Sequence, residues 1–170
     1  ISNLRPKGAA VNNSAMTSTG AVSFLNIFDV TGSTIGQNNR RAALMVGLDC
    51  THPDIEEFLH VKQRNEKLSS MNISIKFTDE FMNAVKNKEK FTLHFDGENE
   101  HIEKEIDAYA FFKEFCETQW DYGDPGALFI DRIRSFNLLS GYDDYNIDIT
   151  NPCAEFAGNG GNSCNLGSIN

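Results

Sequence analysis

The stretch AALMVGLDCTHPDIEEFLHVKQ, residues 42–63, decides the fold class. Residues 42–48 are a nearly unbroken apolar run, short enough for a strand that is buried on both faces. Thr51 and Pro53 then mark a helix start, and we expect a helix from Pro53 to about Gln63. A buried strand that leads directly into a helix is the repeating unit of an α/β protein.

The same alternation extends to both sides of this stretch. We expect a helix over 21–35, a half-buried strand over 72–77, a helix capped by Thr78, a strand over 91–95, a charged surface loop over 98–105, an amphipathic helix over 109–120 and a turn over 122–126. Residues 128–133 fit either a strand or a helix, and residues 1–20 read as an ordered loop. The prediction is one α/β domain over 1–170.

Composition excludes several classes of protein. The 170 residues are 40% hydrophobic and 23% charged, as in a soluble globular domain. A net charge of −9 argues against a long contact with DNA or with an anionic membrane. No apolar run approaches the ~18 residues of a membrane helix, and no secretory signal opens the chain. We therefore expect a cytoplasmic protein with neither DNA nor membrane as a partner.

The four cysteines are too few and too unevenly spread for a secreted disulfide framework. Cys50 ends the expected buried strand and Cys116 lies on the amphipathic helix, so both are predicted to be small core residues. Cys153 and Cys164 lie close together, without the Cys-x-x-Cys spacing or nearby histidine of a zinc site. No metal site is expected.

The motif NPCAE, residues 151–155, places Asn151, Cys153 and Glu155 at alternate positions. In an extended loop these three side chains project to the same side, where one ligand could meet them all. A glycine-rich stretch then leads to SCNLGSIN, residues 163–170, and could fold Cys164 back toward the first thiol. The alternatives are that Asn151 only starts a turn, that Glu155 is a solvated carboxylate and that the thiols have no reactive role.

NPCAE followed by SCNLGSIN resembles the active-site loop of ribonucleotide reductase large (catalytic) subunits, with a spacing similar to that of the adenosylcobalamin-dependent class II. Four further blocks fit the same family in the same order: SNLRPKG (2–8), RRAALMVGLDCTHPDIEEFLHVKQ (40–63), LSSMNISIKFTDEFMNAV (68–85) and GDPGALFIDRI (123–133). Residues 86–117 match only loosely, and residues 156–162 depart from the usual proline-containing sequence.

This resemblance implies a fold and a set of residue roles. The chain would be an internal fragment, incomplete at both ends, of a ten-stranded α/β barrel, with residues 151–155 at the tip of the finger loop that runs through the barrel. Cys153 would become a thiyl radical and remove the 3′ hydrogen of a ribonucleotide. Glu155 would take the proton of the 3′ hydroxyl, and Asn151 would hydrogen-bond the sugar hydroxyls. Cys164 would be one of the two thiols that supply the reducing electrons.

The resemblance also implies partners. The radical would come from adenosylcobalamin, or alternatively from a di-metal subunit as in class I, with no metal held by this segment. The expected partners are a ribonucleotide substrate, a deoxynucleotide or ATP effector, the remainder of the reductase chain, a thioredoxin-type reductant and a second copy in a homodimer. Loops over 7–19 and 64–71, with Lys7, Arg64 and Lys67, would bind the effector, unless they are ordinary surface connections. The alternative to an enzyme is a nucleotide-binding fragment without turnover.

Overall fold

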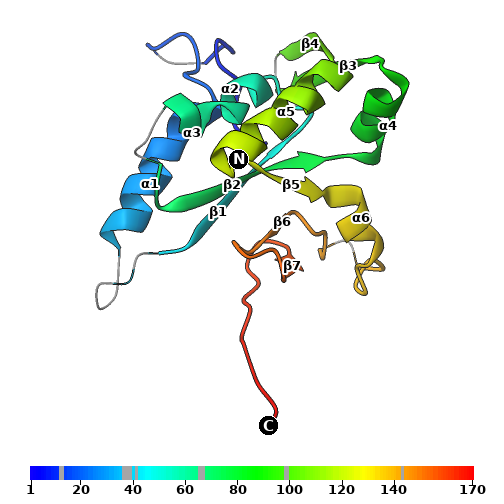
Figure 1. Ribbon diagram of the computed structural model, residues 1–170. Coiled ribbons are helices and arrows are strands. Elements are labelled where there is room, and N and C mark those ends of the chain that lie inside the picture. The colour runs from blue at the N-terminus through cyan, green and yellow to red at the C-terminus, as the bar shows by residue number, and fades with distance from the viewer. Residues whose placement is uncertain (12–13, 36–39, 41, 65–67, 98–99, 143) are drawn as a thin grey trace.

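A parallel sheet of three strands lies at the centre of the computed structural model, which describes residues 1–11, 14–35, 40, 42–64, 68–97, 100–142 and 144–170. The strands are β1 (Leu44–Asp49), β2 (Met71–Phe77) and β5 (Gly126–Phe129), and β2 lies between the other two. Helices connect them, as parallel pairing requires (Figure 1). The α/β prediction is confirmed, and within the described residues the three strands form an open sheet, not a closed barrel.

One face of the sheet carries the hydrophobic core. Val46 and Leu48 of β1 stand beside Ile73 and Ile75 of β2 and face helices on that side. These helices are α2 (Ile55–Leu59), α3 (Val61–Arg64), α4 (Asp79–Asn87) and α5 (Ala108–Tyr122). Phe77 centres an aromatic cluster there, with ring centroids 5.2 Å from Phe81 and 5.1 Å from Phe115.

Local sequence signals place the helix ends well. Thr78 Oγ1 accepts a hydrogen bond from the Phe81 amide at 3.1 Å, so the predicted cap of α4 is confirmed. Gly123 ends α5 with a φ of 76°, as the predicted turn requires. The helix expected over 53–63 breaks at His60 into α2 and α3. Residues 128–133, predicted as either a strand or a helix, contain the end of strand β5 and the start of helix α6 (Ile130–Ser135).

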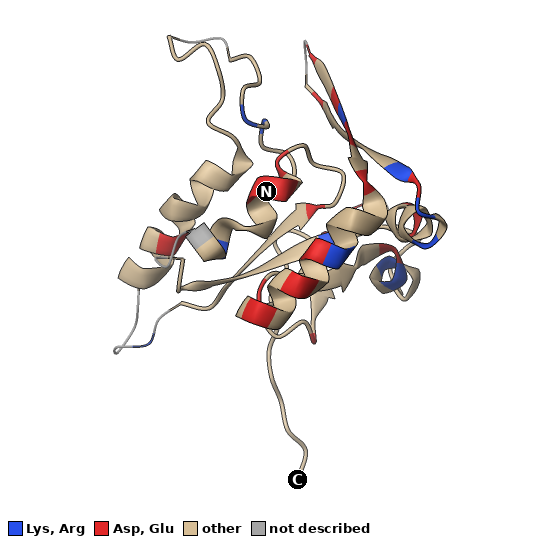
Figure 2. Cartoon of the chain, turned by 45° about the horizontal axis from the view of Figure 1, so that its top comes forward, with Lys and Arg blue, Asp and Glu red and all other residues tan. Residues whose placement is uncertain are grey.

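The N-terminal helix is a 3₁₀ turn, η1 (Ala21–Phe24), followed by α1 (Leu25–Thr34), close to the prediction. Helix α5 carries three exposed acidic residues, Glu114, Glu117 and Asp121, and acidic positions appear as red bands along its ribbon in Figure 2. None of the described helices is both long and apolar enough to cross a bilayer.

The surface loop predicted over 98–105 is wrong, because residues from His101 onward form a strand. β3 (Lys90–Asp96) pairs in antiparallel register with β4 (His101–Asp107). Only one face of this ribbon is buried, by Phe91, Leu93 and Ile106. The acidic residues of β4 occupy the solvent face, whereas Lys104 shares the face of Ile106 and pairs with Glu56 of α2. The excess of charge therefore concealed an alternation of apolar and charged residues that is typical of a strand on the surface.

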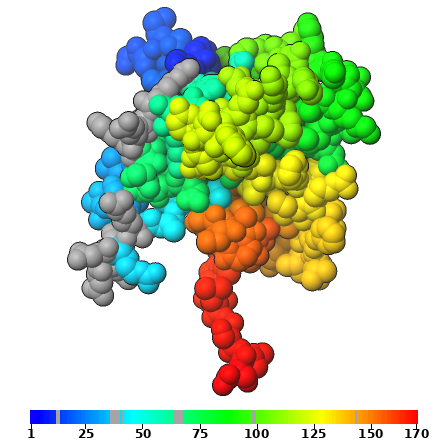
Figure 3. All heavy atoms as spheres, in the orientation of Figure 1, coloured from blue at the N-terminus to red at the C-terminus, as the bar shows by residue number. Residues whose placement is uncertain are grey.

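The second face of the sheet is also covered, so β2 is buried on both faces and not half-buried as predicted. Ser74 is 4% exposed and Lys76 is 8% exposed, although both point away from the core. The cover includes a short hairpin, β6 (Ile149–Thr150) and β7 (Ala157–Gly158), which lies below the sheet in Figure 1. In Figure 3 the same segment forms the orange surface above the red C-terminal tail. Helix α6 lies beside this hairpin (Figure 1).

Candidate functional site

The motif NPCAE forms the turn of the β6–β7 hairpin. The Asn151 amide donates to Phe156 O at 3.0 Å, and the Phe156 amide donates back to Asn151 Oδ1 at 3.1 Å. Within the turn, the Ala154 amide donates to Asn151 O at 3.0 Å, and Ala154 has a φ of 63°. The structure thus places residues 151–155 at the tip of a loop, as the resemblance implied.

The same geometry contradicts one expectation. Asn151, Cys153 and Glu155 were expected to project to one side of an extended loop, but the backbone from Asn151 to Phe156 reverses direction. The left-handed conformation at Ala154 ends any strand-like alternation of side chains. Asn151 does start a turn, so that alternative is correct for its backbone and for its side-chain oxygen.

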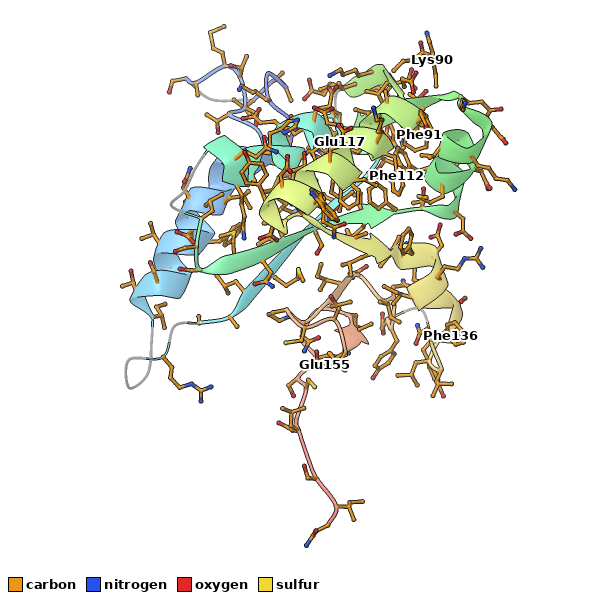
Figure 4. All side chains as sticks on the ribbon, viewed as in Figure 1. Lys90, Phe91, Phe112, Glu117, Phe136 and Glu155 are labelled. Atoms are coloured by element: carbon orange, nitrogen blue, oxygen red, sulfur yellow. The ribbon has the colours of Figure 1, made fainter. Side chains whose placement is uncertain are left out.

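The reactive groups of the turn differ in exposure. Cys153 and Glu155 are exposed, and Asn151 is half-buried at the base of the turn. Figure 4 shows Glu155 on the side of the hairpin from which the C-terminal tail leaves. Because Asn151 Oδ1 accepts the Phe156 amide, the Asn151 side chain offers its NH₂ group to a ligand. The turn therefore presents a thiol, a carboxylate and an amide donor.

Cys164 and Asn151 line one cavity of about 230 Å³ behind the hairpin, together with Thr150, Phe156 and Asn159. Neither Cys153 nor Glu155 lines this cavity. All four cysteines are free thiols, and Cys164 is exposed. The structure thus brings Cys164 to the cavity that Asn151 lines, and Cys153 does not line this cavity, so the approach of the two thiols to one another stays a prediction.

Contacts from elsewhere in the chain hold the hairpin in place. Gly47 of β1 lies against Ile149, and a Cβ atom on Gly47 would be 2.5 Å from Ile149 Cδ1. Arg134 of α6 donates through Nε to Ile147 O at 2.9 Å, and its Nη2 lies 3.8 Å from Asp148 Oδ1. Sequence reasoning missed these residues. The only signal was their position: Gly47 lies within the family-like block 40–63, and Arg134 directly follows the block 123–133.

A larger cavity of about 750 Å³ is lined by the edge strand β1, by the N-terminal residues 1–4 and by the segment that leads into β6. Lys76 and Asp49, which are partners in the register of β2 and β1, form an ion pair of 2.6 Å on its wall. Arg134 and Asp148 line it as well. Two cations and two carboxylates make this face of the sheet polar, in contrast to the apolar face that carries the helices.

Of the three predicted effector-binding residues, Lys7 is the one whose side chain the structure describes. Lys7 lies 3.3 Å from Glu57 in an exposed ion pair, and its backbone amide donates to Asp54 Oδ1 at 3.0 Å. Lys67 lies outside the described residues, and of Arg64 only the backbone at the end of α3 is described. An effector role for these three residues stays a prediction.

The two remaining cysteines differ from one another. Cys50 is fully buried, as predicted, and burial raises the pKa of its thiol to about 11. Cys116 is exposed, so the prediction that it is a core residue is wrong. Helix α5 turns Phe111, Phe115 and Thr118 toward the core, and a residue directly after Phe115 is rotated by roughly 100° from that face. Among the residues described, no three His, Cys, Asp or Glu side chains gather as a metal site.

The chain is similar in sequence to known proteins of one family. The model of the ribonucleotide reductase barrel domain matches residues 1–170. A vitamin B12-dependent ribonucleoside-diphosphate reductase of Thermoplasma acidophilum is 38% identical over 172 residues, which cover 100% of the chain and 22% of that protein. A protein of the same name from Mycobacterium tuberculosis is 36% identical, with 100% of the chain and 24% of that protein covered.

A third relative carries a different name. The ribonucleoside-diphosphate reductase subunit alpha of Synechocystis is 30% identical, with 100% of the chain and 27% of that protein covered. The chain thus spans about a quarter of the length of these relatives. The match of the family model along the whole chain, with a hairpin that presents Cys153 at its tip, shows that the chain belongs to the ribonucleotide reductase family.

Proposed function

We propose that the protein reduces ribonucleotides to deoxyribonucleotides and that residues 1–170 supply the part of its barrel that carries the reactive thiol. The observation that carries this proposal is the exposed position of Cys153 at the tip of a hairpin whose backbone is fixed by hydrogen bonds. Family membership supports the reaction type. A thiol at such a tip is open both to a radical source and to a substrate.

Cys153 suits the first step because a sulfur radical exchanges a hydrogen atom with a sugar carbon, which a hydroxyl or a carboxylate side chain does not do readily. In the proposed step the Cys153 radical takes the 3′ hydrogen of the ribose and becomes a thiol. The carbon left behind carries the unpaired electron. Cys153 returns the hydrogen atom when the deoxynucleotide forms.

Glu155 and Asn151 assist in the loss of the 2′ hydroxyl. The Glu155 carboxylate accepts the proton of the 3′ hydroxyl as general base. The Asn151 NH₂ group, left available by the bond from Phe156 to Asn151 Oδ1, donates to a sugar hydroxyl and stabilises developing negative charge. The 2′ hydroxyl takes a proton from one of the two reducing thiols and leaves as water.

Cys164 is proposed as one of two thiols that reduce the sugar intermediate. Together the two thiols give up two electrons and two protons and close into a disulfide. The shared cavity of Cys164 and Asn151 supports this role, because a ligand held by the amide there also meets the thiol. A thioredoxin-type reductant restores the two thiols after each turnover.

Adenosylcobalamin is the proposed radical source, because the two relatives with the highest identities given above are named vitamin B12-dependent. When bound, this cofactor supplies a carbon-centred radical. The exposed Cys153 sulfur fits a radical delivered from outside this segment, and we assign no described residue to hold the cofactor. A di-metal radical subunit is the alternative, with the same roles for the hairpin residues.

We propose the remaining partners on family grounds alone. They are a ribonucleotide substrate, a deoxynucleotide or ATP effector that Lys7, Arg64 and Lys67 help to bind, and a second copy of the chain in a cytoplasmic homodimer. Effector binding would place positive side chains against the phosphates.

The test is reduction of a labelled ribonucleotide by the full-length protein with a dithiol reductant, with and without adenosylcobalamin. The proposal predicts deoxynucleotide formation that depends on adenosylcobalamin and is absent in Cys153→Ser. Formation only with a di-metal subunit would replace the cofactor and keep the reaction. Nucleotide binding without reduction under either condition would favour a nucleotide-binding protein without turnover.

A further inference from the structure

The β6–β7 hairpin is small and depends on contacts outside itself. Each of its strands has two residues, and its backbone bonds join Asp148 to Gly158 and Asn151 to Phe156. A two-stranded hairpin of this size is at best marginally stable alone. Its place over the sheet must therefore come from the residues that it touches.

Helix α6 makes polar contacts to the segment that enters the hairpin. Arg134 Nε donates to Ile147 O at 2.9 Å, and Arg134 Nη2 lies 3.8 Å from Asp148 Oδ1. Beyond the end of this helix, Asn137 Nδ2 donates to Tyr145 O at 2.7 Å. Ile147 is 9% exposed, so Arg134 binds the chain directly beside a buried anchor.

We propose that Arg134 is a positioning residue for the reactive hairpin: its guanidinium fixes the chain at Ile147 and Asp148 and thereby sets where Asn151, Cys153 and Glu155 stand. Arg134 touches none of these three residues, so it acts only through the backbone that carries them. The expected loss of activity rests on the proposed function. The expected loosening of the hairpin does not depend on it.

A guanidinium suits this task. Its planar set of N–H donors can bind a carbonyl and a carboxylate at once. Hydrogen transfer between a thiol and a sugar requires reacting atoms about 3–3.5 Å apart, and a displacement of about 1 Å can cost on the order of 100-fold in rate. A small displacement of the backbone at the base of the hairpin is therefore expected to move the Cys153 thiol at its tip and to slow hydrogen transfer.

Arg132 provides a matched control on the same helix. It pairs with Asp79 through Nε at 3.2 Å, its side chain is 75% exposed, and it makes no described contact with residues 144–158. Arg132→Met and Arg134→Met remove the same charge and the same side-chain length from α6. Only the second removes a contact with the hairpin.

The first measurement is amide hydrogen exchange of the full-length protein. Arg134→Met is expected to speed exchange at Asp148, Asn151 and Phe156 by about five- to tenfold, because each of these amides is held by a hairpin hydrogen bond. Arg132→Met is expected to leave them unchanged. Equal exchange of these amides in the two variants would overturn the proposal, whether or not the protein is a reductase.

The second measurement separates positioning from general stability. In the active full-length enzyme, Arg134→Met is expected to lower kcat by about 10- to 100-fold with KM for the ribonucleotide within about twofold. A wild-type kcat in correctly folded Arg134→Met would contradict the proposal. An inactive wild-type protein would instead contradict the proposed function and leave the exchange measurement to decide the positioning role.

Discussion

Ile149 of the hairpin lies against the bare backbone of Gly47, so closely that a Cβ atom on Gly47 would be 2.5 Å from Ile149 Cδ1. These two residues come from opposite ends of the fold, β1 and β6. Their contact holds the segment that carries Cys153 against the polar face of the sheet. The absence of a side chain at Gly47 is what permits this approach.

Gly47→Ala is therefore expected to destabilise the fold by about 0.5–1.5 kcal/mol, because the new methyl group forces Ile149 Cδ1, the movable end of that side chain, out of its place. Gly141→Ala is the control, since a Cβ there meets nothing within 4 Å. Urea unfolding of both variants measures the difference. In the double variant Gly47→Ala/Ile149→Ala the effects should not add, because the second change removes the clash; simple additivity would contradict the contact.

Cys50 should be inert in the folded protein, whereas Cys116, Cys153 and Cys164 should react with an alkylating reagent at neutral pH. Burial raises the pKa of Cys50 from 9.0 to about 11, so the unfolded chain loses this proton at lower pH than the folded one. The contribution of Cys50 to stability is thus complete below pH 9 and is lost as the pH rises toward 11. Mass spectrometry of the alkylated protein checks the first point.

The pH dependence has its own control. Cys50→Ala lacks the thiol, so its free energy of unfolding should fall less steeply between pH 9 and 11 than that of the wild type. Identical slopes for the two proteins would show that the thiol is not protected by burial.

Replacing Asp49 should lower the free energy of unfolding more than replacing its ion-pair partner Lys76. The Lys76 side chain is 10% exposed and the Asp49 side chain is 38% exposed. Asp49→Asn leaves a buried ammonium with a weaker partner and should cost about 1–3 kcal/mol, after allowance for solvent at Asp49. Lys76→Met leaves a carboxylate that water can reach and should cost less. Chemical unfolding that ranks the two variants in the opposite order would contradict this burial.

Part of the fold could be predicted because its signals are local. The apolar run of β1, the Thr78 cap and the glycine turn at the end of α5 each depend on a few neighbouring residues. β4 was missed because its charged residues outnumber the apolar ones that alternate with them. Cys116 was misplaced because one position along a helix changes the face on which a side chain lies.

The candidate site likewise has features that the sequence predicts and features that depend on distant contacts. Cys153 and its neighbours could be located from a motif, and a turn at Asn151 was one of the two predicted possibilities. The motif alone did not decide between the turn and an extended loop, which the bond from the Phe156 amide to Asn151 Oδ1 decides in favour of the turn. Gly47 and Arg134 carried no local sign of a role, because their partners Ile149 and Ile147 lie in other elements. Contacts of this kind are set by packing and not by pattern.

The central claim is that Cys153 starts the reaction and Cys164 completes it, and two variants of the full-length enzyme test it most directly. With Cys153→Ser, no thiol accepts the 3′ hydrogen, so a ribonucleotide with a 3′ tritium label should keep its label and stay intact. With Cys164→Ser, the 3′ hydrogen is still removed and the 2′ hydroxyl still leaves, but the sugar intermediate is not reduced and decomposes with release of free base.

The decisive measurement is therefore the release of free base and of tritium from the 3′-labelled ribonucleotide by each variant. The expected result is release of both by Cys164→Ser and of neither by Cys153→Ser. Equal base release by the two variants, or full deoxynucleotide production by Cys153→Ser, would contradict the assignment of these two thiols.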